Sequence, residues 1–208
     1  IEPSVPYSLA TIIRNTGFGT ARNVRITSAQ PQIIENEKGL FIDFQIIATE
    51  VAGQNVMPSL TANFGDLVPG GIGIGRWLLK STLQGLFVEY SATFEHLDNL
   101  GDPRASIIQS VDIRELIRIV SAPGLFQDNL PDMLVNDFED LEDLPDKLYL
   151  SDGTVHPVGI VQSGVVGGSL APNNLQVTLA ANTPVGWTYL RAPDPGNGNY
   201  RLKHYLIA

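Results

Sequence analysis

A strand–turn–strand pattern near the amino end most strongly limits the folds open to this chain. Apolar and β-branched residues fill 9–13, and a second such run begins at Val24. Between the two runs lie Asn15, Gly17 and Gly19, residue types that tolerate the positive φ angles of tight turns. On each side of the turn, alternate residues point to opposite faces, as in a half-buried strand. The pattern predicts two strands joined by a sharp turn.

Two motifs in this region have a recognisable spacing. The first is Asn-x-Gly-x-Gly-x-Ala-x-Asn-Val, and its members are Asn15, Gly17, Gly19, Ala21, Asn23 and Val24. The second, Phe-Gly-Asp-Leu-Val-Pro-Gly-Gly at 64–71, is similar to a Gly-x-Leu-x-Pro-Gly turn that precedes a strand. Together they resemble bacterial immunoglobulin-like surface modules, including the cell-adhesion-related (CARDB-like) group. The resemblance covers residues 1–120 and implies a β-sandwich with a structural or adhesion role.

The composition of the whole chain is also that of an all-β protein. Its 208 residues include 20 glycines and 14 prolines, which indicate many turns. A chain of this length can bury a core without metal ions or disulfides, and it has no cysteine. We predict two β-sandwich domains, immunoglobulin-like or fibronectin-like, with a short connecting segment. The expected parts are a domain over 1–120, an acidic linker over 121–146 and a second small sandwich over 147–208, whose completeness the sequence leaves open.

The formal net charge of −9 indicates which binding partners the chain disfavours. Nucleic-acid phosphates and anionic membranes attract clustered Lys and Arg, so we expect neither as a partner. No apolar run reaches the roughly 18 residues that a membrane-spanning helix needs, so we expect no membrane insertion. The chain starts at Ile1 and shows no signal peptide. We interpret it as a fragment of a larger protein.

The expected linker contains a dense run of carboxylates. From 127 to 146 no Lys or Arg balances them. Such a block is usually a solvated segment, which is the interpretation we favour. The alternative is a Ca²⁺ site, because Ca²⁺ takes oxygen ligands, although the spacing is not that of an EF-hand. The candidate ligands are Asp137, Asp140 and Asp143, with Asp146 next. Calcium bound there would stiffen the junction.

Residues with catalytic or ligand-binding potential are few and scattered. Ser151, Asp152 and His156 are close in sequence, but no nucleophile elbow surrounds the serine, and we predict a turn there. We therefore expect no catalytic residues and no cofactor other than calcium. Trp187 and Tyr189 are candidates for a sugar-binding platform, although aromatic residues in a sandwich more often belong to the core.

These observations lead to an expected function and two alternatives. The leading expectation is a non-catalytic structural or adhesion module of a large secreted or cell-surface bacterial protein. One alternative is an accessory carbohydrate-binding domain of an extracellular enzyme. The other is a subunit of an extracellular filament or surface layer that assembles through strand edges. Protein partners, self-association and carbohydrate all remain open.

Overall fold

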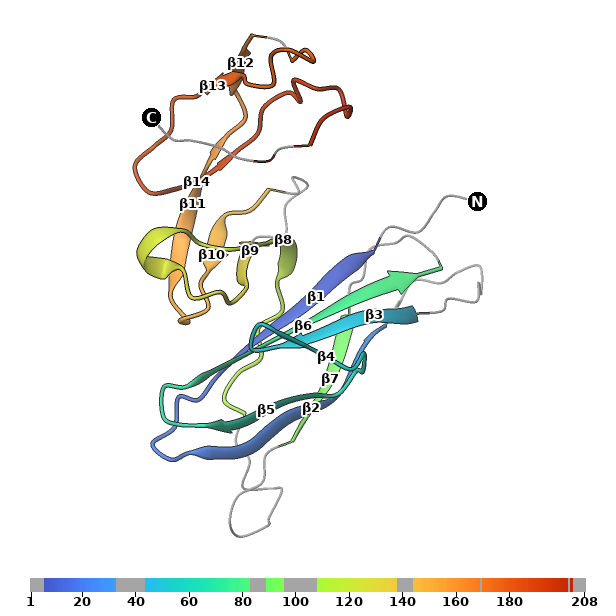
Figure 1. Ribbon diagram of the computed structural model, residues 1–208. Helices are drawn as coiled ribbons and strands as arrows, with labels where there is room; N and C mark the ends of the chain where they lie inside the picture. Colours follow the sequence, from blue (N-terminus) through green and yellow to red (C-terminus); the bar gives the residue numbers. More distant parts are fainter. Residues whose placement is uncertain are drawn as a thin grey trace.

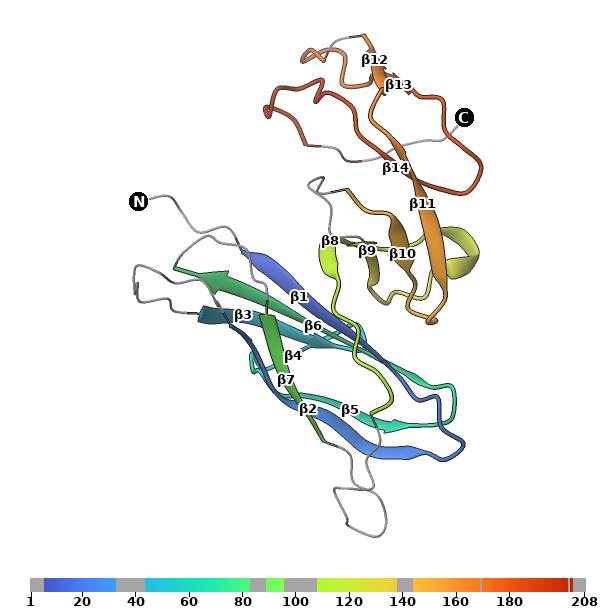
Figure 2. The same ribbon diagram turned by 180° about the vertical axis from the view of Figure 1, so that it is seen from behind.

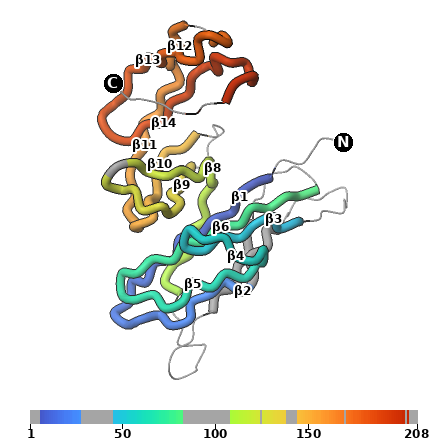
Figure 3. Tube along the Cα trace, in the orientation of Figure 1, coloured from blue at the N-terminus to red at the C-terminus, as the bar shows by residue number. Residues whose placement is uncertain are grey.

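The computed structural model describes residues 6–32, 44–82, 89–95, 108–137, 144–168, 170–201 and 203. These residues form an all-β structure, which confirms the all-β part of the predicted fold class. Two units lie against one another, and the chain passes from the first to the second along the segment that leads into β8 (Figures 1–3). We call them the sandwich and the second unit.

Two sheets face one another in the sandwich. The larger has the order β1-β6-β3-β4, and the smaller has the order β5-β2-β7. The strands of the larger sheet are β1 (Tyr7–Arg14), β6 (Ile72–Ser81), β3 (Phe44–Val51) and β4 (Gln54–Val56). Those of the smaller are β5 (Ala62–Leu67), β2 (Ala21–Gln32) and β7 (Glu89–Glu95). The two strands predicted from the turn at Asn15 correspond to β1 and β2, but they lie in different sheets.

The core of the sandwich lies between these two sheets. Trp77 and Leu79 on β6 meet Ile26 on β2 and are fully buried. The Trp77 indole Nε1 donates a hydrogen bond of 2.9 Å to the Ser59 carbonyl, so the polar atom is satisfied inside the core.

Two glycines inside β6 let the sheets approach closely. Gly73 and Gly75 both lie within β6. A Cβ at Gly73 would lie 2.9 Å from Cδ1 of Phe64, and one at Gly75 would lie 3.0 Å from its Cζ. The Phe64 ring on β5 thus occupies the space that two side chains would take. The two glycines therefore serve packing between the sheets.

The second unit is a five-stranded sheet with the order β14-β11-β10-β9-β8, accompanied by a two-stranded ribbon. Its strands are β8 (Glu115–Val120), β9 (Asp132–Asn136), β10 (Lys147–Tyr149), β11 (Val155–Val161) and β14 (Trp187–Leu190). The ribbon consists of β12 (Val165–Gly167) and β13 (Thr178–Ala180). β11 and β14 are parallel, and the ribbon lies within the crossover that joins them. A short 3-10 turn, η2 (Gly124–Phe126), precedes β9.

The range 121–146 differs from the expected linker. It contains η2 and β9, and β9 pairs with β8 on one side and β10 on the other. The expected boundary after residue 120 therefore falls between two paired strands. The physical reason is burial: Met133 and Val135 face the sandwich, while Leu134 faces the opposite side of the sheet. A strand with both faces covered cannot act as a solvated linker.

One face of the second unit packs on the outer face of β1 and β6. Ile74 from β6 joins Met133 and Val135 in a buried apolar cluster. We call this cluster the interface core. Partly buried residues from both units surround it; they are Ala10, Ile12, Ile72, Leu116, Ile119, Leu130 and Tyr149. β6 is thus covered on both sides, by Phe64 and the sandwich core on one and by the second unit on the other.

Candidate functional site

The carboxylate of Asp132 organises the side of the second unit that faces away from the sandwich. It is buried, with 1% of its surface exposed. Its Oδ2 accepts a hydrogen bond of 2.7 Å from the Ala122 amide, and its Oδ1 accepts one of 2.8 Å from the Ser151 amide. The Ser151 hydroxyl donates to Asp128 Oδ2 at 2.6 Å. We expected both aspartates to belong to a solvated acidic run. Asp128 is exposed but Asp132 is buried, and together they fix the loop of η2 to the turn at 151–153.

That loop places Phe126 beside two other aromatic rings. The centroids of Phe126 and Trp187 are 5.7 Å apart, and His156 lies 6.1 Å from each of them. We call these three residues the aromatic group. Such distances are typical of attractive edge contacts between rings. Trp187 also packs on a buried cluster of Ala122, Leu148 and Leu150. Trp187, predicted from sequence as a ligand residue, is therefore half-buried and in contact with its own chain.

Tyr189, the second predicted ligand residue, lies two positions further along β14 and is also half-buried. The Arg191 guanidinium carbon lies 5.6 Å from the centroid of its ring, within the range of a cation–π contact. A hydrogen bond from the Arg191 side chain lowers the pKa of the Tyr189 hydroxyl. Each of the two rings thus has a partner within the chain. Carbohydrate binding at this pair stays a prediction.

The structure describes two of the four predicted calcium ligands, Asp137 and Asp146. Asp140 and Asp143 lie outside the described residues. Asp137 forms an ion pair with Arg114 and accepts a hydrogen bond of 3.2 Å from the Tyr149 hydroxyl. Its backbone amide donates to Asp146 Oδ1 at 2.7 Å. The structure therefore brings Asp137 and Asp146 together, and it supplies a cation from the segment before β8 that the local sequence did not reveal.

The described residues hold no group of three or more His, Asp or Glu side chains placed to bind a metal ion. Among these residues, Asp146 Oδ2 is buried without a hydrogen-bond partner. Calcium at this end of β9 and β10 stays a prediction. Among all the residues that the structure describes, no helix is long and apolar enough to cross a bilayer.

The two motifs that carry the family resemblance meet at one end of the sandwich. The Asn15 side-chain amide donates to the carbonyls of Gly19 and Leu67, both at 2.8 Å. Its Oδ1 accepts a hydrogen bond of 2.9 Å from the Gly17 amide. The backbone of Asn15 also pairs with Gly70 and Gly71 at 2.8 and 2.9 Å. Asn15 therefore joins the β1–β2 loop to the β5–β6 loop.

This junction presents apolar side chains to solvent. Phe18, between two glycines of the first loop, is fully exposed, and Val68 on the second loop is 59% exposed. Pro69 beside it is also exposed. We call Phe18, Val68 and Pro69 the apolar tip. Sequence reasoning found the turn at Asn15 but missed the tip, because the exposure of Phe18 depends on neighbours that the local sequence does not show.

No family model, curated protein or solved structure matches the chain. The resemblance to bacterial immunoglobulin-like modules therefore stays a prediction that rests on the residues around Asn15 and 64–71.

Proposed function

We propose that the chain is a non-catalytic structural module of a secreted or cell-surface bacterial protein, where it holds other parts at a fixed spacing in support of adhesion. The observation that carries this proposal is the interface core. Ile74 from the sandwich and Met133 and Val135 from the second unit form one buried cluster. Burying apolar side chains from both sides opposes bending between the units, since any hinge motion would expose them to water.

Two glycines at the edge of the interface support a rigid junction. A Cβ at Gly53 in the β3–β4 turn would lie 3.1 Å from the Asn129 carbonyl oxygen. One at Gly153 would lie 2.6 Å from Cδ1 of Ile72. Both glycines have positive φ angles, which disfavour other residues. Backbone from each unit thus lies directly against the other, as in a fixed rather than a sliding contact.

The non-catalytic part of the proposal is supported by the roles of the chemically capable side chains. The Ser151 hydroxyl donates to Asp128. Asp152 Oδ1 accepts hydrogen bonds from both the amide and the hydroxyl of Thr154, at 2.8 and 2.6 Å. These bonds lower the pKa of the Asp152 carboxyl, which keeps it an acceptor. The groups hold turns together, in keeping with the turn predicted at 151–153.

The rigidity of the junction can be measured directly, because a chain without cysteine allows labels at chosen sites. Spin labels at Asn55→Cys and Val185→Cys would place one probe on an exposed position of each unit. Pulsed electron resonance should give one narrow distance distribution. A Met133→Asp variant, which puts a charge into the interface core, should broaden it, whereas Val165→Asp on the exposed ribbon should not. A broad distribution in the labelled chain with an intact interface would exclude the rigid module.

A further inference from the structure

The loop that follows β14 contains the one Asn-Gly pair in the sequence, Asn197 and Gly198. Glycine has no side chain to hinder its backbone nitrogen, so this nitrogen can attack the side-chain amide of an asparagine that precedes it. The attack is the first step of asparagine deamidation. Both residues are exposed, so water reaches the reacting atoms. The pair thus combines a reactive sequence with access to solvent.

The pair forms the centre of a tight turn. Asn197 and Gly198 have φ angles of 47° and 78°. The Asn199 amide donates a hydrogen bond of 2.9 Å to the Gly196 carbonyl, which closes the turn. Positive φ angles at both central positions are typical of a type I′ turn, and asparagine followed by glycine is the pair that adopts it most readily. The same two residue types therefore serve the turn and create the reactive pair.

The Asp194 carboxylate holds the nitrogen that would attack. Its Oδ2 accepts a hydrogen bond of 2.7 Å from the Gly198 amide, and its Oδ1 accepts one of 2.8 Å from the Gly196 amide. These two bonds lower the pKa of the Asp194 carboxyl, so the group is charged at neutral pH. The Gly198 nitrogen must lose its proton before it attacks, and a negative charge beside it disfavours the resulting anion. Asp194 therefore opposes the first step of the reaction.

Two other asparagines show what the glycine adds. Asn23 and Asn129 also have positive φ angles, of 52° and 64°. Val24 and Leu130 follow them in the chain, so a branched side chain hinders each attacking nitrogen. Of the positive-φ asparagines within the described ranges, Asn197 alone is followed by glycine. The backbone conformation is shared, and the unhindered nitrogen is particular to this site.

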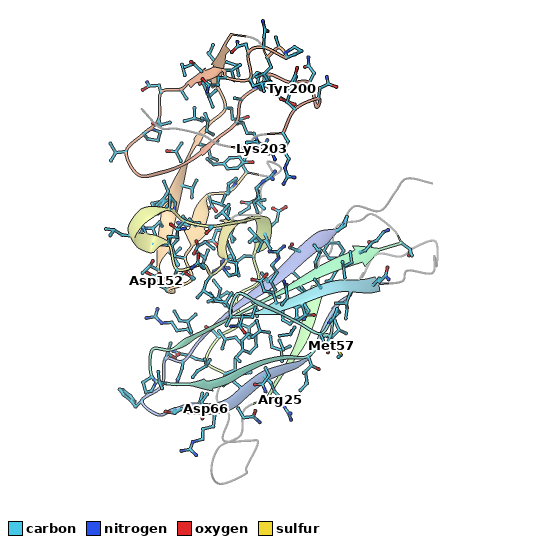
Figure 4. All side chains as sticks on the ribbon, in the orientation of Figure 1. Arg25, Met57, Asp66, Asp152, Tyr200 and Lys203 are labelled. Atoms are coloured by element: carbon cyan, nitrogen blue, oxygen red, sulfur yellow. The ribbon has the colours of Figure 1, made fainter. Side chains whose placement is uncertain are left out.

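Deamidation would alter the loop and leave the junction between the units intact. A Cβ at Gly196 would lie 2.9 Å from Cδ2 of Tyr200, so the Tyr200 ring packs on the turn. Figure 4 shows Tyr200 at the end of the second unit that points away from the sandwich. Isoaspartate would add a carbon atom to the main chain of the turn, and either product would add a carboxylate near that of Asp194. The interface core lies elsewhere, between β6 and β9.

We propose that Asn197 is a modification site, which converts without an enzyme to aspartate and isoaspartate at a rate that Asp194 restrains. Solvent base takes the Gly198 amide proton, and the nitrogen lone pair forms a bond to Asn197 Cγ. The Cγ–Nδ2 bond breaks, and Nδ2 takes a proton from water and leaves as ammonia. Water then adds to either carbonyl of the cyclic imide and opens it. The inference goes beyond the proposed function and does not rest on it, because the reaction needs only this loop and water.

Incubation of the full chain at mildly alkaline pH, followed by peptide mapping with mass spectrometry, tests the proposal. Both products should accumulate at Asn197 in the folded chain, and more slowly than in the same chain unfolded in urea. Asp194→Ala should raise the rate in the folded chain by about threefold to tenfold, the factor that corresponds to the net free energy of one hydrogen bond. Asp152→Ala is the matched control, because Asp152 is also an exposed aspartate that accepts a turn amide. It should leave the rate at Asn197 unchanged.

Further measurements separate the hydrogen bond from the local sequence. In urea, Asp194→Ala and the unaltered chain should react at the same rate; acceleration of the same size in urea as in the folded chain would overturn the role of the turn. Asp194→Asn keeps an acceptor and should accelerate the reaction less than Asp194→Ala. Equal acceleration by both variants, or none by either, would reject the hydrogen bond as the restraint. Conversion of Asn129 as fast as Asn197, or no product at Asn197 in folded Asp194→Ala, would exclude the site.

Discussion

The two units of this molecule bury their apolar residues in different ways. The sandwich encloses Trp77, Leu79 and Ile26 between two of its own sheets. The sheet of the second unit turns Met133 and Val135 outward, where they are covered by the sandwich, and uses the buried carboxylate of Asp132 to hold its other side. The difference teaches that the first unit encloses its core by itself, while the second has a cluster of its own around Leu148 and Leu150 but shares its other cluster with its neighbour.

The largest expected effect comes from Trp77→Ala. Removing a fully buried tryptophan should lower the free energy of unfolding by about 3–5 kcal/mol. Because the second unit shares the interface core with the sandwich, hydrogen exchange should speed up in β8–β10 as well as in β1–β6. Urea unfolding followed by circular dichroism gives the free energy, and exchange read by mass spectrometry gives its distribution. Unchanged protection of β8–β10 would show that the second unit is stable on its own.

A smaller effect is expected for Met133→Ala, which removes a side chain of the interface core from the second unit. The loss should be about 2–3 kcal/mol, near the lower end for buried methionine, because a surface between units can adjust to a gap. Exchange should speed up in β8–β10 while β2 and β6 keep their protection. Leu134→Ala, on the opposite face of the same strand, is the control: it should destabilise the second unit without affecting the exchange of β1. Equal loss of protection in both units after Met133→Ala would show that the two units depend equally on the interface core.

The smallest expected effect is a change in the stability of the sandwich at alkaline pH. Burial raises the pKa of Tyr7, at the start of β1, from 10.0 to about 12. Between these values the unfolded chain loses the phenol proton and the folded chain keeps it, so stability is full below pH 10 and falls as the pH rises toward 12. Tyr7→Phe should therefore flatten the decline in melting temperature between pH 10 and 12. Tyr200→Phe is the control, because the Tyr200 ring is exposed. If the melting temperature of Tyr7→Phe declines with an unchanged slope, ionisation of Tyr7 is not the cause of the decline.

Local patterns in the sequence predicted the features whose causes are local. The turn at Asn15, the turn at Ser151 and the all-β class all follow from residue types within a few positions. The strand β9 was missed because Asp132, the residue before Met133, counts as a solvated charge in a local pattern. Its burial depends on the amides of Ala122 and Ser151, which the fold brings to it.

The candidate site was less predictable for the same physical reason. Asp137 belongs to a run without nearby cations, yet Arg114 reaches it from the segment before β8. Trp187 was identified as an aromatic candidate, but its contact with Phe126 depends on how the loop of η2 folds back. The part of the linker that carries Asp140 and Asp143 lies outside the described residues, so calcium binding there remains a prediction.

The pairing of β1 with β6 has a consequence for the newly made chain. Tyr7 pairs with Leu79, about 70 residues later in synthesis. At roughly 5–20 residues per second, the apolar strand that contains Leu9 and Ile13 waits roughly 4–14 s for its partner to be translated. During that interval an unpaired strand edge is open to pairing with neighbouring nascent chains. Of these two paired strands, β1 is synthesised before β6, so β1 is the one that needs shielding while synthesis continues.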